Sequence, residues 1–245
     1  MINSLSLTSK EQENGCQMCA FSSTCFPSAF GGVSADEIRS IISPEEKFYS
    51  KQITHEQGQA FHSLYVIKSG AVKTYINTVE GKERITAFYL PGDIVGLESI
   101  AGGIHLNSAS IISDSRICKI DYANLAILRK ENATLSDWAI NVFSLSLAAD
   151  HEFFQCLSLI TASSKLATFL LNISKRSSRS EEHQLVFKLP MSRLEIGNYL
   201  GIAAETASRA FSKLADKKCI EKSSRQINII DLAKLKEYAN ASRAR

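Results

Sequence analysis

The sequence lacks any run of about 18 apolar residues, the length that marks a membrane-spanning helix. Its N-terminus also lacks the order of a secretory signal, which is a basic stretch, an apolar stretch and a small-residue cleavage site. Apolar residues nevertheless make up 44% of 245 positions, enough for a sizeable core and more than one domain. These observations predict a cytoplasmic protein without contact to a membrane.

A strong net charge is also missing. The value of +3 permits contact with nucleic acid but does not by itself indicate it. The basic residues are unevenly spread, however, and many lie in the last third of the chain. This uneven distribution indicates that an acidic partner would bind to the last third of the chain and not to its whole surface.

The six cysteines are not expected to form structural disulfides, because the cytosol keeps thiols reduced. Cys16, Cys19 and Cys25 follow a C-x2-C-x5-C spacing beyond a polar N-terminal tail. A C-x2-C pair can bring two thiolates to one soft metal centre. The segment therefore predicts a metal site, with a redox dithiol or small apolar loop residues as alternatives. A tetrahedral centre needs a fourth ligand, which this segment does not contain.

Cys118 stands apart from these three, in a run expected to form the last strand of a sheet. Alternation along a strand places Ile117 and Lys119 on one face and Cys118 on the other. Taken alone, Cys118 is typical of a core thiol. It is a candidate fourth ligand if the N-terminal segment folds back over the sheet. Cys156 and Cys219 have no such company and are interpreted as small buried apolar residues.

Residues 48–120 change character to short apolar runs that are separated by turn signals about every ten residues. This pattern predicts a β barrel or sandwich, preceded by a short helix over residues 34–42. The expected turns include His55 to Gly58, Ser69-Gly70, Pro91-Gly92-Asp93 and Ser113-Asp114-Ser115.

A small barrel can hold a ligand, and a cyclic nucleotide would need a cation for its phosphate. Residues 96–112 contain no Lys or Arg and offer only His105 and Asn107. We interpret His105 as a surface residue and the barrel as structural, so no cyclic nucleotide is expected. An enzyme with a metal in the barrel is disfavoured too, because His55, His62 and His105 form no tight cluster in the sequence.

Residues 134–160 show a helical pattern with two apolar stripes. The first stripe has the spacing of a coiled-coil seam and predicts a homodimer. The residues of this stripe, which would lie in the dimer interface, are Ile140, Phe143, Leu147, Asp150 and Phe154. Asp150 would then face its copy, and the repulsion would make the dimer marginal. The second stripe is expected to pack on the barrel, and it comprises Leu135, Trp138, Val142, Leu145, Ala149, Phe153, Cys156 and Ile160. The alternative is one helix buried on both sides within a single chain.

Ser192 followed by Glu195 is a capping-box signature for a helix that ends at Gly201. A second helix follows, and small or apolar residues fall where the two helices would cross: Ile196, Gly197, Leu200, Ile202, Ala207 and Ala210. This pattern predicts a helix-turn-helix, although a solvated helical hairpin has the same spacing.

The second helix turns Glu205, Ser208 and Arg209 outward by their i, i+3, i+4 spacing. Arg can bind guanine O6 and N7, Glu can accept from cytosine N4, and Ser can contact several bases. Basic residues then flank a short alternating run at 226–230, as in a wing that contacts phosphates: Lys217, Lys218, Lys222 and Arg225. The C-terminal part is therefore predicted to bind double-stranded DNA.

The order of a cysteine segment, a barrel, a long helix and a winged helix-turn-helix resembles the cyclic AMP receptor protein superfamily over nearly the whole chain. Within it, the chain is similar to the oxygen-sensing fumarate and nitrate reduction (FNR) branch. The resemblance implies an α+β fold with a cysteine-rich segment at 1–33, a β-roll at 34–133, a dimerisation helix at 134–162 and a DNA-binding domain at 163–245. It also implies that Cys16, Cys19, Cys25 and Cys118 are ligands of a [4Fe-4S] cluster.

By the same resemblance, Glu205, Ser208 and Arg209 match the E-x-x-S-R residues that recognise TTGAT-type half-sites, and Asp150 matches the acid in the dimerisation helix. The implied function is a regulator, activator or repressor, whose cluster supports the dimer until oxygen removes it, and which contacts RNA polymerase. Ala203 replaces the usual Thr cap, and Met18, Ala20, Phe21 and Thr24 also depart from the pattern. The alternative is a regulator with a structural zinc or another small ligand and no oxygen response.

Overall fold

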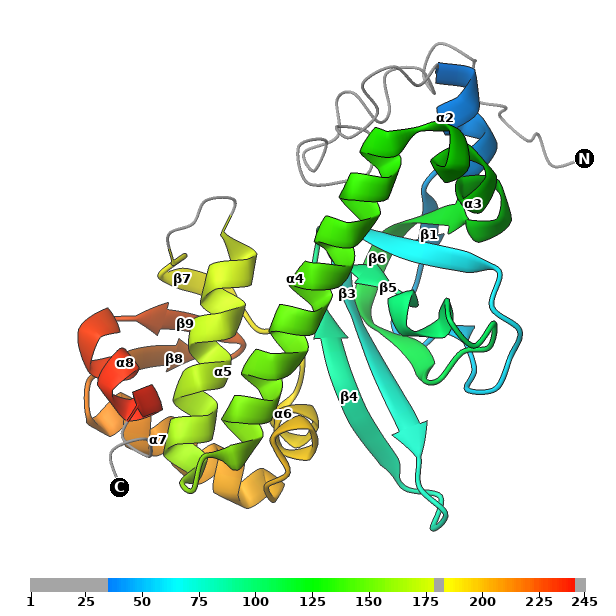
Figure 1. Ribbon diagram of the computed structural model, residues 1–245. Coiled ribbons are helices and arrows are strands. Elements are labelled where there is room, and N and C mark those ends of the chain that lie inside the picture. Colours follow the sequence, from blue (N-terminus) through cyan, green and yellow to red (C-terminus); the bar gives the residue numbers. More distant parts are fainter. Residues whose placement is uncertain (1–34, 179–182, 241–245) are drawn as a thin grey trace, which may run out of the picture.

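The computed structural model of the protein describes residues 35–178 and 183–240. Cys16, Cys19 and Cys25 therefore lie outside the described residues. Figure 1 shows an N-terminal β-roll and a C-terminal helical domain with a small sheet, joined by the long helix α4 (Ala133–Ser158). The fold class is α+β, as predicted.

The β-roll is an antiparallel sheet in the order β1-β6-β3-β4, with β2 paired to β6 and β5 paired to β3. Two apolar clusters fill it, one around Ile67, Ile111 and Ile117 and the other around Leu64 and Ile120. The strands are β1 (Glu46–Phe48), β2 (Ile53–His55), β3 (Ser63–Asn77), β4 (Glu83–Tyr89), β5 (Ile94–Val95) and β6 (Ser108–Asp121).

Two predicted turns lie instead within the long paired strands β3 and β6. Ser69-Gly70 lies within β3, and the turn signal at 113–115 lies opposite it within β6. Gly70 has φ +87, and a Cβ there would overlap Ser115 Oγ and the Asp114 carbonyl. Ser115 Oγ accepts the Ala71 N–H at 3.1 Å, so the partner strand completes the hydrogen bonding. The irregularity shifts the register without ending either strand.

Three helices follow or flank the roll: α2 (Ala35–Ile41), α3 (Tyr122–Glu131) and α4. The expected packing of the second α4 stripe on the barrel holds at the start of the helix, where Leu135 is buried in a cluster of the roll. Cys156, near the other end, is buried in a cluster made mainly of residues from the C-terminal domain. Between them Leu145 is 72% exposed, and beyond them Ile160 is 81% exposed. The prediction was wrong there because α4 crosses from one domain to the other, over a cavity of about 610 Å³ that Leu145 lines. Within the described ranges, no helix is long and apolar enough to span a membrane.

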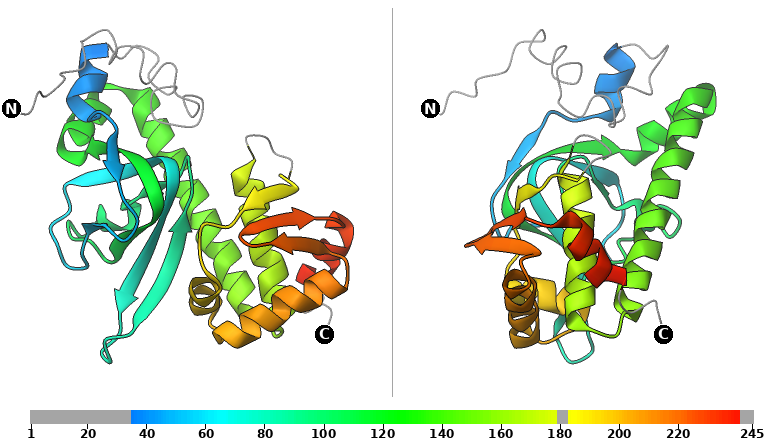
Figure 2. Two further views of the ribbon diagram at one scale, coloured as in Figure 1. Left: turned by 180° about the vertical axis from the view of Figure 1, so that it is seen from behind. Right: turned by 90° about the vertical axis from the view of Figure 1, so that its left-hand side faces the viewer.

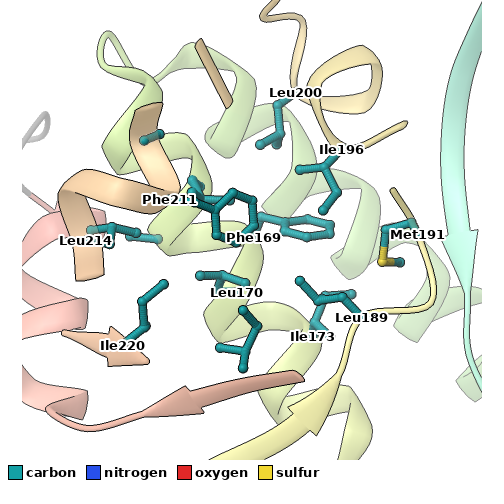
Figure 3. Close-up of a cluster of buried hydrophobic side chains, with 14 of the residues drawn as sticks. Phe169, Leu170, Ile173, Leu189, Met191, Ile196, Leu200, Phe211, Leu214 and Ile220 are labelled. Atoms are coloured by element: carbon teal, nitrogen blue, oxygen red, sulfur yellow. The ribbon is translucent and has the colours of Figure 1, made fainter. Parts of the chain in front are cut away.

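The C-terminal domain packs three long or medium helices and one short helix around a three-stranded sheet of order β7-β9-β8. Figure 3 shows its core, where Phe169 and Leu170 meet Phe211 and Leu214. Its elements are α5 (Ala162–Ser177), β7 (Val186–Lys188), α6 (Arg193–Leu200), α7 (Ala204–Asp216), β8 (Ile220–Ser223), β9 (Gln226–Ile229) and α8 (Leu232–Asn240).

One further expectation concerns the C-terminal domain and its boundary with α4. Cys156 and Cys219 are buried, as predicted, at 4% and 0% exposure. The helix α5 continues to Ser177. Ser174 is fully buried and its Oγ donates to the Gln184 carbonyl at 2.8 Å. A hydrogen bond to a residue ten positions away thus stabilises a polar residue within the helix.

Candidate nucleic-acid interface

The helix-turn-helix is built from local signals that the structure confirms. Ser192 Oγ accepts the Glu195 N–H at 3.2 Å, and the Glu195 carboxylate accepts the Ser192 N–H at 2.8 Å. Gly201 ends α6 in a left-handed conformation with φ 65. A Cβ on Gly197 would lie 2.8 Å from the Ile202 carbonyl, so only glycine allows so close an approach of the turn. Together these residues fix the angle between α6 and α7.

The helix α7 has one buried and one exposed face. Ala207, Ala210, Phe211 and Leu214 are buried in the domain core. Glu205, Ser208 and Arg209 are exposed on the opposite side, as predicted. The N-cap Ala203 makes no side-chain hydrogen bond, so the first turn lacks the usual side-chain support. The exposed face thus offers a guanidinium, a carboxylate and a hydroxyl for base edges.

The predicted wing is the β8–β9 hairpin beside this face. Lys222 Nζ donates to Ser212 Oγ on α7 at 3.1 Å, which ties the hairpin to the helix. Arg225 donates to the Pro190 carbonyl at 3.2 Å. All four predicted wing cations, Lys217, Lys218, Lys222 and Arg225, are exposed. A row of cations next to α7 can neutralise phosphates on either side of a groove.

Arg193 is a supporting residue of the helix-turn-helix that the sequence analysis missed. Its guanidinium lies 3.2 Å from the centre of the Phe211 ring, and its buried Nη1 has no hydrogen-bond partner among the described residues. Burial lowers the pKa of Arg193. The contact between the guanidinium and the Phe211 ring holds the start of α6 against α7, so Arg193 supports the angle between the two helices. Its position at the start of α6 is the only hint that the sequence offers.

The predicted dimerisation residues form an exposed apolar stripe along α4. Ile140 is 66%, Phe143 40%, Leu147 57% and Phe154 66% exposed. Asp150 lies on the same helix, and partial withdrawal of its carboxyl group from water raises its pKa, an effect that His151 opposes. The part of the chain that the structure describes does not cover these side chains. The dimer seam stays a prediction that this exposure favours.

Cys118 is half-buried on β6, on the face predicted from alternation. It packs with the cluster that contains Ile120, whereas Ile117 belongs to the other cluster. Ile38 of α2 and Trp138 of α4 pack against the same cluster. Just after α2, the Ser43 N–H donates to the Lys119 carbonyl at 2.9 Å, so residues 42–48 run along β6 beside Cys118.

These contacts leave the metal site itself a prediction. In the two described stretches, no group of three or more His, Cys, Asp or Glu residues could hold a metal ion. Of the four proposed ligands, only Cys118 lies in these stretches.

His105, expected at the surface, is buried in the roll. Its N–H donates to the Gln59 carbonyl at 2.8 Å, which draws the loop onto the roll. His55 and His105 are each 3% exposed, and their rings stack with centroids 3.7 Å apart. Burial, and then the neighbouring His105, lower the pKa of His55 to about 3. The interpretation of His105 was wrong because a tertiary contact, absent from the local sequence, decides its position.

Asn107 also lies inside the roll, in a chain of polar contacts. Its Oδ1 accepts from Thr86 at 3.2 Å, and its Nδ2 donates to Glu98 at 3.3 Å. A carboxylate beside Asn107 disfavours a phosphate at that point. The absence of a cyclic nucleotide remains a prediction.

Comparisons with known proteins give two matching families. Residues 45–132 match the cyclic nucleotide-binding domain family, and residues 164–238 match the Crp-like helix-turn-helix domain family. The first region is the β-roll with α3, and the second contains α5 to most of α8. The two matches therefore divide the chain where α4 joins its two parts.

Whole-chain relatives agree with this division. The chain is 34% identical to the fumarate and nitrate reduction regulatory protein of Vibrio cholerae, over 93% of this chain and 91% of that protein. It is 32% identical to the transcriptional activator protein Anr of Pseudomonas protegens, over 93% of each chain. Its structure is similar to FixK2 of Bradyrhizobium japonicum with a TM-score of 0.72 and 28% identity, covering 80% of this chain and 96% of that one.

Proposed function

The chain belongs to the CRP/FNR family of DNA-binding transcription regulators, and from this we propose that it binds palindromic TTGAT-type sites as a homodimer whose stability depends on a [4Fe-4S] cluster and hence on oxygen. The observation that carries the proposal is the exposed trio Glu205, Ser208 and Arg209 on α7, beside the basic wing.

Each exposed residue of α7 would contact a different group of the DNA. Arg209 would donate two parallel hydrogen bonds to guanine O6 and N7, and Glu205 would accept from a cytosine amino group. Ser208 lies between them and can contact a neighbouring base or phosphate. Lys217, Lys218, Lys222 and Arg225 would bind phosphates and so supply affinity without sequence preference. A palindromic site follows from the two-fold symmetry of a dimer.

The α4 stripe supports the dimer. Ile140, Phe143, Leu147 and Phe154 are 40% to 66% exposed and would be covered by the same residues of a second copy. Burying each large apolar side chain favours association by about 1.5 to 3 kcal/mol at most. Asp150 opposes this, since two carboxylates would approach each other in a partly dry interface. These opposing effects would leave the dimer only marginally stable, so a modest additional association free energy can shift the monomer–dimer equilibrium.

The residues around Cys118 fit the proposed ligand set. Four thiolates are the ligands that iron-sulfur clusters take, and the described chain approaches β6 next to Cys118 through Ser43 and Lys119. A bound cluster would supply an oxygen-labile link between Cys16, Cys19, Cys25 and Cys118. Cys118 shares its apolar cluster with Trp138 of α4, so the position of the N-terminal segment can influence the dimerisation helix. A DNA-bound dimer would also contact RNA polymerase, as activator or repressor according to the promoter.

The deciding experiment measures iron and acid-labile sulfide per chain in protein purified without oxygen, before and after brief exposure to air. We expect about four of each per chain, lost in air together with the dimer and with binding to a TTGAT palindrome. Sedimentation and DNA titration report the last two. Zinc or no metal, with DNA binding indifferent to air, would leave the regulator but exclude the oxygen response.

A further inference from the structure

The C-terminal domain is fixed to the β-roll through β4 as well as through α4. In the described sheet β4 pairs with β3 alone, so its other edge presents free backbone groups. Asn198 of α6 lies at this edge. Its Nδ2 donates to the Glu83 carbonyl at 2.8 Å and its Oδ1 accepts the Ile85 N–H at 2.8 Å. The side-chain amide therefore binds β4 as the peptide group of a neighbouring strand would.

A second helix of the domain binds the other end of the same strand. Arg176, in the last turn of α5, donates to the Phe88 carbonyl at 2.7 Å and to the Asp93 carboxylate. Asp93 is itself held, since it accepts the Leu90 N–H at 2.6 Å. Asn172 accepts from the same guanidinium at 3.3 Å. Both ends of β4 are thus bonded to the C-terminal domain.

Apolar and ionic contacts complete the junction. Tyr199, next to Asn198, stacks on Phe153 of α4 with ring centroids 4.3 Å apart, and it lies 5.0 Å from Phe88 of β4. Lys73 of β3 pairs with Glu195 of α6 at 3.3 Å and with Glu83 at 2.6 Å. The views in Figure 2 show the β3–β4 hairpin extending beside the C-terminal domain.

The covalent connection alone is a weak constraint on orientation. Between α4 and α5 only Leu159 to Thr161 are outside the helices, and both Leu159 and Thr161 have extended backbone angles. Small rotations there would swing α7 through a large arc. Two α7 helices must meet successive major grooves about 34 Å apart, so such a swing would misplace one of them.

We propose that Asn198 and Arg176 are positioning residues, which bind the backbone of β4 and thereby set the separation of the two α7 helices in the dimer. This inference rests on the palindromic DNA binding proposed above. The residues of the trio recognise a half-site, whereas Asn198 and Arg176 decide which spacing between half-sites is accepted.

The test uses the full-length dimer prepared without oxygen and a set of TTGAT palindromes whose half-site separation varies by single base pairs. The wild type should bind one spacing best. Asn198→Ala should reduce that preference by about tenfold while affinity for the non-optimal spacings changes little, because two hydrogen bonds are lost only in the docked orientation. Arg176→Met should act in the same direction from α5. A uniform loss at every spacing would show a merely structural role and overturn the proposal.

Asn124→Ala is the matched control, because Asn124 Nδ2 also donates to a backbone carbonyl, that of Ser40, but far from the C-terminal domain. It should leave the spacing preference unchanged. Hydrogen exchange at the Ile85 amide, measured without DNA, tests the docking role of Asn198 independently of the proposed DNA binding. If the wild type binds no palindrome, the proposed function fails. Faster Ile85 exchange in Asn198→Ala would then still support the docking role, and unchanged exchange would overturn it.

Discussion

The helices α7 and α4 are both amphipathic, but they differ in where their apolar faces lie. In α7, Phe211 and Leu214 are buried against α5 and the sheet of their own domain. In α4, Leu147 and Phe154 are exposed, and half of the helix crosses a cavity. The apolar face of α7 is buried within the chain, whereas that of α4 is exposed and is predicted to be covered by a second copy. The difference agrees with the two proposed roles, in which α7 presents polar groups to DNA and α4 forms an interface between copies.

The largest test of this difference compares two phenylalanines. Phe211→Ala should lower the free energy of unfolding by about 3 to 5 kcal/mol, because it leaves a cavity in a packed core. Phe154→Ala, the matched control, should cost the monomer under about 1 kcal/mol but weaken the dimer. Urea unfolding and sedimentation equilibrium measure the two effects. Equal losses of monomer stability would mean that Phe154 is buried within a single chain.

A smaller effect is expected on the polar side of α7. Arg209→Ala should cost about 1 to 3 kcal/mol at each half-site and relax the preference for its guanine. Lys222→Ala should instead weaken binding to all sequences and reduce the salt dependence. Titration of a TTGAT palindrome and of variants with that guanine changed tests both. Unchanged binding by Arg209→Ala would refute its role in recognition.

A substitution of Asp150 tests the apolar stripe of α4, because a charged carboxylate there would oppose the association of two apolar helices. Asp150→Ala should raise the dimer fraction in air, by about 1 kcal/mol of association free energy, because a like-charge contact is removed. Sedimentation of the air-exposed protein measures the ratio. Asp137→Ala, near the start of α4 and outside the predicted stripe, is the control. No change in the ratio with Asp150→Ala would remove Asp150 from the mechanism.

The smallest effect concerns the buried pair His55 and His105 in the β-roll. The pKa of His55 falls from 6.5 to about 3 on folding, so its contribution to stability is complete above the unfolded value and is lost as the pH falls toward 3. At about pH 5.5 the roll should be less stable by roughly 1 kcal/mol than at neutral pH. His55→Phe should reduce this slope in urea unfolding of metal-free protein. If the stability of the variant falls with pH as steeply as that of the wild type, His55 is not the group responsible.

The features that could be predicted from sequence are those set by local chemistry. The Ser192 and Glu195 cap, the Gly201 end of α6 and the exposed trio on α7 depend on neighbours a few residues away. The misplaced features depend on distant ones. Gly70 signals a turn, but it lies within a long strand in which Ser115 Oγ accepts the N–H of the next residue, Ala71. His105 has a polar setting in sequence, and only its stacking on His55 shows it to be buried.

The predicted packing of the second α4 stripe on the barrel was wrong for a related reason. Periodicity identifies an apolar face, but it does not say whether a barrel, a cavity or a second chain lies against that face. Leu135 and Leu145 belong to the same predicted stripe, yet one is fully buried and the other 72% exposed. Likewise, no local signal could indicate that Asn198 and Arg176 would bind a strand of the other domain.

The bonds from Asn198 to β4 also protect the protein against self-association through strands. A free sheet edge is a template on which the strand of another molecule can add, with aggregation as the usual result. Asn198 occupies the Ile85 N–H and the Glu83 carbonyl, and Arg176 occupies the Phe88 carbonyl. A fragment that ends after α4 would expose these groups. The isolated roll should therefore precipitate or exchange strands more readily than the intact chain.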